Sequence, residues 1–208
     1  MERTMSIAAW LFVVGLVSGA VVLGGLLLSI VRPTVRFWPH GDRNWTFWVG
    51  WVAWILYFGS LVGVAYVDWQ TAFRPALVVE IVAAVLVVAG ALVSTWAVWH
   101  LGFHESSGLS GELDTGGPYR YSRNPQYVGY VTMLVGSGVI AGSWLVAVLV
   151  IIGIAWFLLA PLAEEPWLRE QYGEAYVKYA ESVPRFVGTG SKRDLPNDRA
   201  RQSNEEDE

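Results

Sequence analysis

Polar and aromatic residues that could bind a ligand or take part in catalysis are concentrated in two short stretches of a chain that is otherwise rich in apolar residues. The first stretch is Gly116–Tyr127, and the second is the adjacent pair Glu164 and Glu165. Arg120 and Arg123 of the first stretch can bind a carboxylate through paired hydrogen bonds, and the two Glu side chains can bind an ammonium group. Together the two stretches predict a site for a small zwitterion.

Tyr side chains in the first stretch can cover a planar ring or a cationic centre of such a ligand. They are Tyr119, Tyr121 and Tyr127. Each cluster also has a purely structural explanation. Arg residues at a cytosolic helix end are typical of membrane topology, and two Glu residues that open a helix stabilise its dipole. For either cluster alone the two explanations are equally well supported, and their joint placement favours function.

The elements that would position these clusters are long apolar helices. The chain has 208 residues, of which 54% are hydrophobic and 15% are charged, whereas soluble domains carry about 25% charged residues. About 20 residues of helix cross the ~30 Å hydrocarbon core of a bilayer. Hydrophobic runs near or above this length predict an all-α integral membrane protein with about five transmembrane helices, over residues 6–31, 45–67, 76–99, 127–141 and 143–163.

The distribution of basic residues predicts how the chain is oriented in the membrane. All but Arg3 and Arg74 of the 14 Lys and Arg residues follow the first, third or fifth apolar run. Because basic residues concentrate on the cytosolic side, we expect the N-terminus outside and the C-terminus in the cytosol. The site would then lie on the cytosolic face of the cell membrane.

The last two apolar runs form a hairpin that returns both polar clusters to the same level. After the hairpin, Pro166 is expected to start a new amphipathic helix, since Pro suits the first helical turn, and Pro184 is expected to end it. The domain organisation that follows is transmembrane helices in 1–101, a catalytic core in 102–186 and a disordered tail in 187–208.

The two clusters resemble the paired signatures of the isoprenylcysteine carboxyl methyltransferase family. The run Gly117-Pro118-Tyr119-Arg120-Tyr121-x-Arg123-Asn124-Pro125-x-Tyr127-x-Gly129 resembles its Gly-Pro-Tyr-x-x-x-Arg-His-Pro-x-Tyr-x-Gly pattern. The pair Glu164-Glu165 and the residues after it resemble its second signature. Asn124 replaces the usual His, as in the phospholipid N-methyltransferases of the wider superfamily, which also have Glu-Glu-Pro. Because Asn cannot titrate near neutrality, a histidine acid–base role is not expected.

The resemblance implies S-adenosylmethionine as the methyl donor and assigns roles to residues of both clusters. Arg123 and Glu165 would be catalytic. The cofactor would contact Gly117, Tyr119, Arg123, Asn124, Pro125, Tyr127, Glu164 and Glu165, and the acceptor would contact Arg120, Tyr176 and Arg185. The acceptor would be membrane-borne or small and apolar: a prenylcysteine carboxylate, an aminophospholipid or a thiol.

Two other functions stay open on the sequence. Sterol reductases share an Arg-x-Pro-x-Tyr loop, so an NADPH-dependent membrane oxidoreductase is one alternative, and a non-catalytic membrane scaffold is the other. The lack of a basic stripe disfavours nucleic-acid binding. His100 and His104 have a spacing that can hold a metal, but the chain has only three His and no Cys, so we expect no metal.

Overall fold

The computed structural model describes residues 2–32 and 34–188, and every regular element in these ranges is helical. The long helices are α1 (Glu2–Val31), α2 (Trp45–Val67), α3 (Leu77–Leu101), α5 (Pro125–Ala141) and α6 (Trp144–Tyr172). The short ones are α4 (Phe103–Ser106), the 3-10 helix η1 (Gly117–Arg120) and α7 (Glu174–Ser182). Residues 189–208, most of the tail expected to be disordered, lie outside the described residues.

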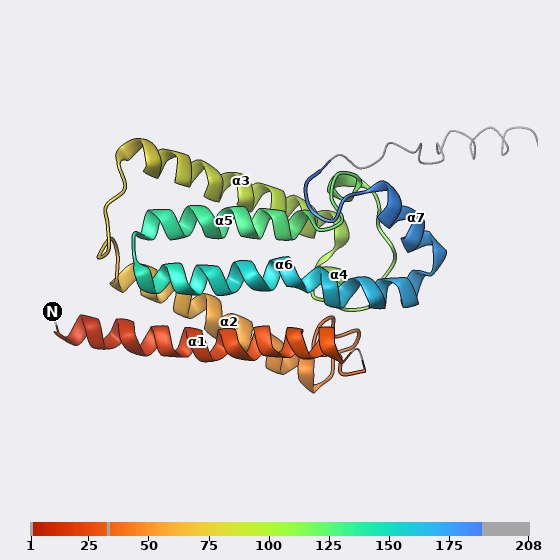
Figure 1. The fold of residues 1–208 in the computed structure, drawn as a ribbon, viewed down its shortest axis with the longest axis horizontal. Coiled ribbons are helices and arrows are strands. Elements are labelled where there is room, and N and C mark those ends of the chain that lie inside the picture. The colour runs from red at the N-terminus through yellow and green to blue at the C-terminus, as the bar shows by residue number, and fades with distance from the viewer. Residues whose placement is uncertain (1, 33, 189–208) are drawn as a thin grey trace, which may run out of the picture.

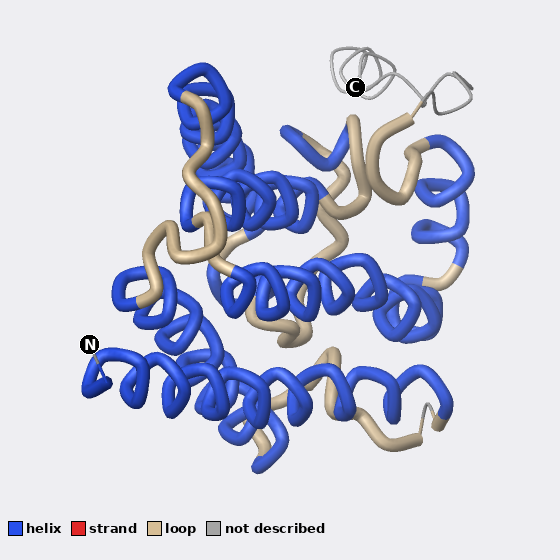
Figure 2. Tube along the Cα trace, turned by 60° about the vertical axis from the view of Figure 1, so that its left-hand side comes forward, coloured by secondary structure: helices blue, strands red, loops and turns tan. Residues whose placement is uncertain are grey.

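The long helices form two pairs joined by a central helix. α1 packs against α2, α3 packs against α5, and α6 lies between the pairs and contacts α1, α2 and α5 (Figures 1 and 2). The connections at 32–44 and 102–124 and helix α7 all meet at one end of the bundle (Figure 1). Both predicted polar clusters therefore lie at that end.

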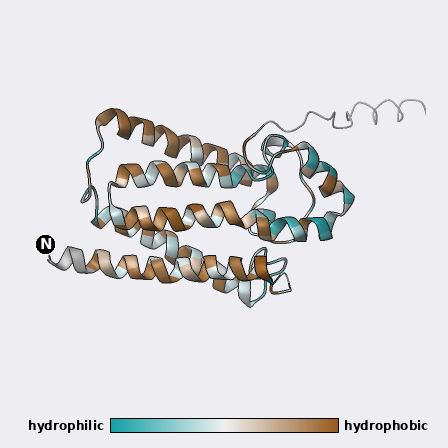
Figure 3. Ribbon diagram, in the orientation of Figure 1, coloured by the Kyte–Doolittle hydropathy of each residue, from teal (hydrophilic) through white to brown (hydrophobic). Residues whose placement is uncertain are grey.

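Four of the long helices, α1, α2, α3 and α6, are long and apolar enough to cross a membrane. This result confirms the all-helical membrane architecture. α5 has 17 residues, so a fifth span, like the orientation of the chain, stays a prediction. Apolar residues cover the long helices, and hydrophilic ones concentrate at the end with α7 (Figure 3). Exposed side chains such as Val82 and Val85 of α3 are those expected to contact lipid.

A close backbone contact fixes α5, whose first turn belongs to the site. A Cβ atom on Gly129 would lie 2.6 Å from the carbonyl oxygen of Gly90 and 2.6 Å from the backbone nitrogen of Ser94. Small residues let membrane helices approach this closely. The contact holds the start of α5 against α3.

The prediction of a new helix at Pro166 is wrong. α6 runs without interruption through Pro161 and Pro166 to Tyr172, although each Pro removes one backbone hydrogen bond. The break comes at Gly173, whose φ of +56° is a left-handed conformation that Gly adopts without strain. The short helix that follows, α7, ends before Pro184 as expected, and its apolar face packs on Tyr119 and Ala97. That face is therefore covered by protein.

Candidate active site

Glu165 of α6 lies at the centre of an ion-pair network. Arg185 donates from Nε to Glu165 Oε1 at 2.6 Å and from Nη2 to Oε2 at 2.8 Å, and Arg123 Nη1 lies 3.2 Å from Oε1. The side chain of Glu165 is 9% exposed. The hydrogen bonds to Glu165 raise the pKa of Arg185 above its ordinary value. One carboxylate thus joins α6, the start of α5 and the segment after α7.

Asn124 reinforces this junction through the backbone. Its Nδ2 donates to the carbonyl oxygen of Arg185 at 2.9 Å, and the backbone N–H of Arg123 donates to the carbonyl of Pro184 at 2.9 Å. The amide at the position where the resembling family has His therefore holds the segment after α7 in place. The amide N–H of Asn124 donates this hydrogen bond without any change in protonation state.

Glu164, the other member of the acidic pair, faces α5 and the segment between α1 and α2. Its Oε1 accepts hydrogen bonds from the hydroxyl of Tyr127 and from Nε1 of Trp38, the latter at 2.5 Å. Trp38 is 9% exposed and is packed at 5.1 Å, ring centroid to ring centroid, against Trp156. Sequence reasoning assigned Trp38 no role in the site, so its contact with the acidic pair was missed.

A cavity of about 120 Å³, which we call the polar cavity after the charged side chains on its wall, separates these groups from the segment 105–114. Among the described residues, the acidic side chains on its wall outnumber the basic ones. The acids are Glu105, Glu112, Asp114, Glu164 and Glu165, and the base is Arg123. The hydroxyl of Tyr172 donates to the carbonyl oxygen of Gly111 at 2.7 Å and so holds the segment over the cavity. The site favours ligands with positive charge.

Buried polar atoms without a hydrogen-bond partner are found on the wall of this cavity. Arg123 Nε, the Tyr119 hydroxyl and Gln126 Oε1 are buried and unpartnered among the described residues. Because buried polar groups are almost always hydrogen-bonded, these atoms indicate a polar ligand. Burial raises the pKa of Tyr119 far above its ordinary value, so its phenol stays protonated at neutral pH.

The structure brings together seven of the residues for which the sequence predicted a role. Those that line the polar cavity are Tyr119, Arg123, Asn124, Tyr127, Glu164, Glu165 and Tyr176. The other four, Gly117, Arg120, Pro125 and Arg185, do not line it. Arg120 is exposed and donates to the carbonyl of Gly117 at 3.1 Å, and Arg185 reaches the site through Glu165. Their roles stay predictions.

Sequence reasoning missed Gln126 and the acidic residues that precede η1. Glu105, Glu112 and Asp114 lie in a short polar segment between the third apolar run and the first signature. That concentration of acids was the available signal. His100 Nε2 lies 3.2 Å from Asp114 Oδ2. In the described ranges no group of three or more His, Cys, Asp or Glu side chains is arranged to hold a metal.

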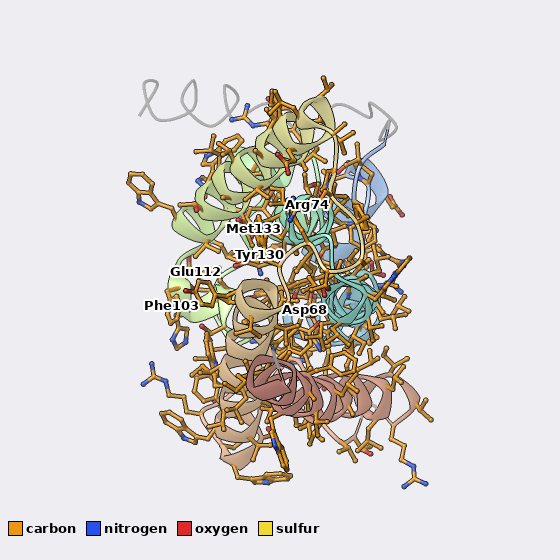
Figure 4. The ribbon with its side chains drawn as sticks, turned by 90° about the vertical axis from the view of Figure 1, so that its left-hand side faces the viewer. Asp68, Arg74, Phe103, Glu112, Tyr130 and Met133 are labelled. Atoms are coloured by element: carbon orange, nitrogen blue, oxygen red, sulfur yellow. The ribbon has the colours of Figure 1, made fainter. Side chains whose placement is uncertain are left out.

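A second cavity, of about 410 Å³, adjoins the polar one. The two share Trp38, Ser106, Gln126 and Tyr127 in their walls. The rest of the second wall is mainly aromatic, and we call it the aromatic cavity. Tyr130 and Met133 of α5, which line it, lie between α2 and α3 in the end-on view (Figure 4).

His40, in the segment between α1 and α2, belongs to the wall of the aromatic cavity. Its ring is 4% exposed and packs edge-on against Phe37, Trp38 and Phe47. Burial lowers the pKa of His40 from 6.5 to about 4, so the imidazole is uncharged at neutral pH. Its Nδ1 has no hydrogen-bond partner among the described residues.

The fold and site define a polytopic helical membrane protein with an acid-lined cavity at one end of its bundle. The family model for phospholipid methyltransferases matches residues 78–175, which run from α3 to the start of α7 and include the first signature and the Glu164-Glu165 pair of the second. The match confirms the resemblance to membrane methyltransferases found in the sequence and suggests methyltransferase activity. No curated protein and no solved structure matched the chain.

Proposed function

We propose that this protein transfers a methyl group from S-adenosylmethionine to an acceptor at the membrane, with residues 102–186 as its catalytic core. The observation that carries the proposal is the polar cavity: it is lined by acids, contains the unpartnered Nε of Arg123, and takes most of its lining from the region that the family model matches.

The charges of the cavity support S-adenosylmethionine over a nicotinamide nucleotide. S-adenosylmethionine has a sulfonium, an ammonium and one carboxylate, whereas NADPH brings several phosphate charges. An excess of carboxylates attracts the first ligand and repels the second, because like charges placed together cost several kcal/mol. Arg123, the one basic side chain on the described part of the wall, can bind the single carboxylate.

The unpartnered atoms fit the same ligand. Arg123 Nε can donate to the carboxylate, Gln126 Oε1 can accept from an amino group, and the Tyr119 hydroxyl can do either. Glu165 would act as a positioning residue, because it fixes the orientation of Arg123. Glu164 would place a carboxylate near the cationic part of the ligand.

When bound, the cofactor would supply an activated methyl group: the acceptor's heteroatom would bond to the methyl carbon as the sulfur–methyl bond breaks, sulfur would keep that bond's electron pair, and the acceptor's proton would leave to solvent. Such a transfer depends mainly on alignment of the two reactants. The protein's contribution would accordingly be to orient both reactants and exclude water, which the buried network around Glu165 is suited to do.

The size of the polar cavity requires movement of its cover. Ligand pockets usually measure about 300–1,000 Å³, so a volume of about 120 Å³ is too small for a nucleoside-sized ligand. The segment 105–114 would move outward when the cofactor enters. The contacts that would have to yield include the hydrogen bond from Tyr172 to Gly111 and those between Gly41 and the backbone of Gly108 and Ser110.

Equilibrium binding to the purified full chain in lipid nanodiscs tests the proposal. We expect radiolabelled S-adenosylmethionine to bind with a micromolar or lower Kd and to be displaced by S-adenosylhomocysteine, with no displacement by NADPH. Tight NADPH binding without S-adenosylmethionine binding would overturn the proposal in favour of an oxidoreductase. Failure of both to bind would favour the scaffold.

A further inference from the structure

The aromatic cavity is not needed to explain cofactor binding, yet it is the larger of the two adjoining cavities. It shares the side chains of Trp38, Gln126 and Tyr127 with the polar cavity. Both Trp38 and Tyr127 donate to Glu164, so the shared wall lies directly beside the acidic pair. A molecule in the aromatic cavity would therefore meet the cofactor at this wall.

Charge is absent from the aromatic cavity as far as the structure describes its lining. None of the side chains on that wall is Arg, Lys, Asp or Glu. A phosphate or carboxylate placed there would lose its hydration without gaining a cationic partner, which costs several kcal/mol. The cavity therefore selects against phospholipid headgroups and carboxylates and favours uncharged molecules.

The shape and position of the cavity fit an apolar molecule that arrives from the lipid. Its wall includes Trp54, Phe58 and Trp156, which pack against one another, and its volume is within the range of small-molecule sites. Ile55 of α2 also lines it and is 66% exposed. Tyr130 and Met133, which also line it, lie between α2 and α3 in the end-on view (Figure 4).

His40 gives this apolar wall a specific polar contact. The imidazole is held by aromatic rings on several sides, and its buried Nδ1 makes no hydrogen bond among the described residues. The other titratable side chains on the wall are Tyr127 and Tyr130, and Tyr127 already donates to Glu164. A buried polar atom without a partner indicates a missing ligand group.

We propose that the aromatic cavity binds the methyl acceptor, and that this acceptor is an uncharged, largely apolar molecule whose thiol or hydroxyl group hydrogen-bonds to His40. The inference rests on the proposed function and narrows its substrate class. According to this inference, phospholipids and prenylcysteine carboxylates are not the acceptors of this protein.

An acceptor panel tests the substrate class. Transfer of tritiated methyl from S-adenosylmethionine would be measured with benzyl mercaptan, with dioleoyl phosphatidylethanolamine and with N-acetyl farnesylcysteine. We expect kcat/KM for the neutral thiol to exceed the other two at least ~10-fold, the discrimination set by one or two unpaired charges or hydrogen bonds. Faster methylation of the phospholipid or the carboxylate would overturn the inference.

Two exposed residues of α2 provide a matched pair of variants. Ile55→Trp places a bulky ring on the wall of the aromatic cavity. Val52→Trp introduces the same ring at a residue that is 55% exposed and does not line the aromatic cavity. We expect Ile55→Trp to raise the KM for benzyl mercaptan at least fivefold and Val52→Trp to leave it unchanged. Equal effects of both variants would contradict the inference.

His40→Phe tests the polar contact while keeping a ring in the aromatic packing. The KM for the acceptor should rise about tenfold, the value of one lost hydrogen bond, and the Kd for S-adenosylmethionine should not change. A measurement of cofactor binding to the wild-type protein distinguishes a failure of the proposed methyltransferase function from a failure of the inference about the acceptor. If wild-type protein binds no S-adenosylmethionine, the proposed function fails. If it binds the cofactor but none of these acceptor effects occurs, the inference alone fails.

Discussion

The polar and aromatic cavities lie side by side and yet handle charge in opposite ways. In the polar cavity, buried charges are kept by pairing them: Glu165 holds Arg123 and Arg185, and Glu164 accepts two hydrogen bonds. In the aromatic cavity, the titratable His40 is kept neutral by burial. Under the proposed function, a charged reactant and an apolar one would each have its own cavity wall and would meet at the few residues that the two walls share.

The largest effect is expected from breaking the charged network. Arg123→Ala leaves the buried carboxylate of Glu165 with one partner fewer, and removal of one member of a buried pair costs about 3–5 kcal/mol. We expect binding of S-adenosylmethionine, measured by equilibrium dialysis, to fall at least 100-fold. Arg120→Ala, an exposed Arg in the same stretch, is the control and should bind normally. Normal binding by Arg123→Ala would show that the pocket is elsewhere.

A pH titration tests whether burial keeps His40 uncharged in the aromatic cavity. Above pH 6.5 His40 is neutral in both the folded and unfolded states, and its contribution to stability is fully present. As pH falls from 6.5 to about 4, the unfolded state takes up a proton that the folded state does not. The free energy of unfolding should then drop by up to about 3 kcal/mol.

Thermal unfolding in detergent micelles across this pH range measures the effect. His40→Phe removes the titrating group, so the variant should lose this part of the pH dependence while other groups keep theirs. The same slope in both proteins would mean that His40 titrates normally and that its cavity is hydrated.

The hydrogen bonds in the wall shared by the two cavities can be removed while the aromatic rings are kept. Trp38→Phe deletes the indole N–H that donates to Glu164, and a hydrogen bond to a charged group contributes about 1.5–3 kcal/mol. We expect kcat to fall about tenfold or more, with a smaller change in cofactor affinity. Tyr127→Phe removes the other donor to the same oxygen. Because both act on one carboxylate, their combined effect should be smaller than the sum.

The smallest effect is expected at the cover of the polar cavity. Tyr172→Phe removes the hydrogen bond to Gly111, which contributes about 1 kcal/mol. We expect the dissociation rate of the cofactor, followed by stopped-flow displacement, to rise about fivefold. Tyr121→Phe is a suitable control, because Tyr121 is exposed and does not line the cavity. An unchanged rate would mean that another contact holds the segment.

Local sequence patterns predicted the helices well, since apolar runs report the hydrocarbon environment directly. They also predicted that the Arg123 loop and the Glu164–Glu165 pair would lie at one level, because a hairpin necessarily returns its ends there. The direct ion pair between Arg123 and Glu165 was not predicted. The contribution of Trp38 and His40 could not be predicted in this way. Trp38 contacts Glu164 across 126 residues of sequence, and an interfacial Trp has the same local pattern whether it faces lipid or a carboxylate. The rings packed on His40 are close to it in sequence, but the cavity wall that it joins also contains residues of α5 and α6.

The end of the last apolar helix was misplaced for a related reason. Pro166 is as compatible with the first turn of a helix as with a tolerated interruption, and local sequence does not separate the two. The left-handed backbone at Gly173 decides where α6 ends. This correction moves the acidic pair from the start of a surface helix into the body of a membrane helix.

The continuity of α6 also connects the site to the thickness of the bilayer. A helix of 29 residues is about 44 Å long, whereas the hydrocarbon core is ~30 Å thick. Either the final turns, which include Glu164 and Glu165, project beyond the acyl chains, or the whole helix is tilted in the bilayer. Because mismatch of length is relieved by tilting or by local deformation of the bilayer, lipids with longer chains would draw the carboxylates toward the boundary with the hydrocarbon. The lipid composition of the host membrane would in this way adjust how much water reaches the polar cavity.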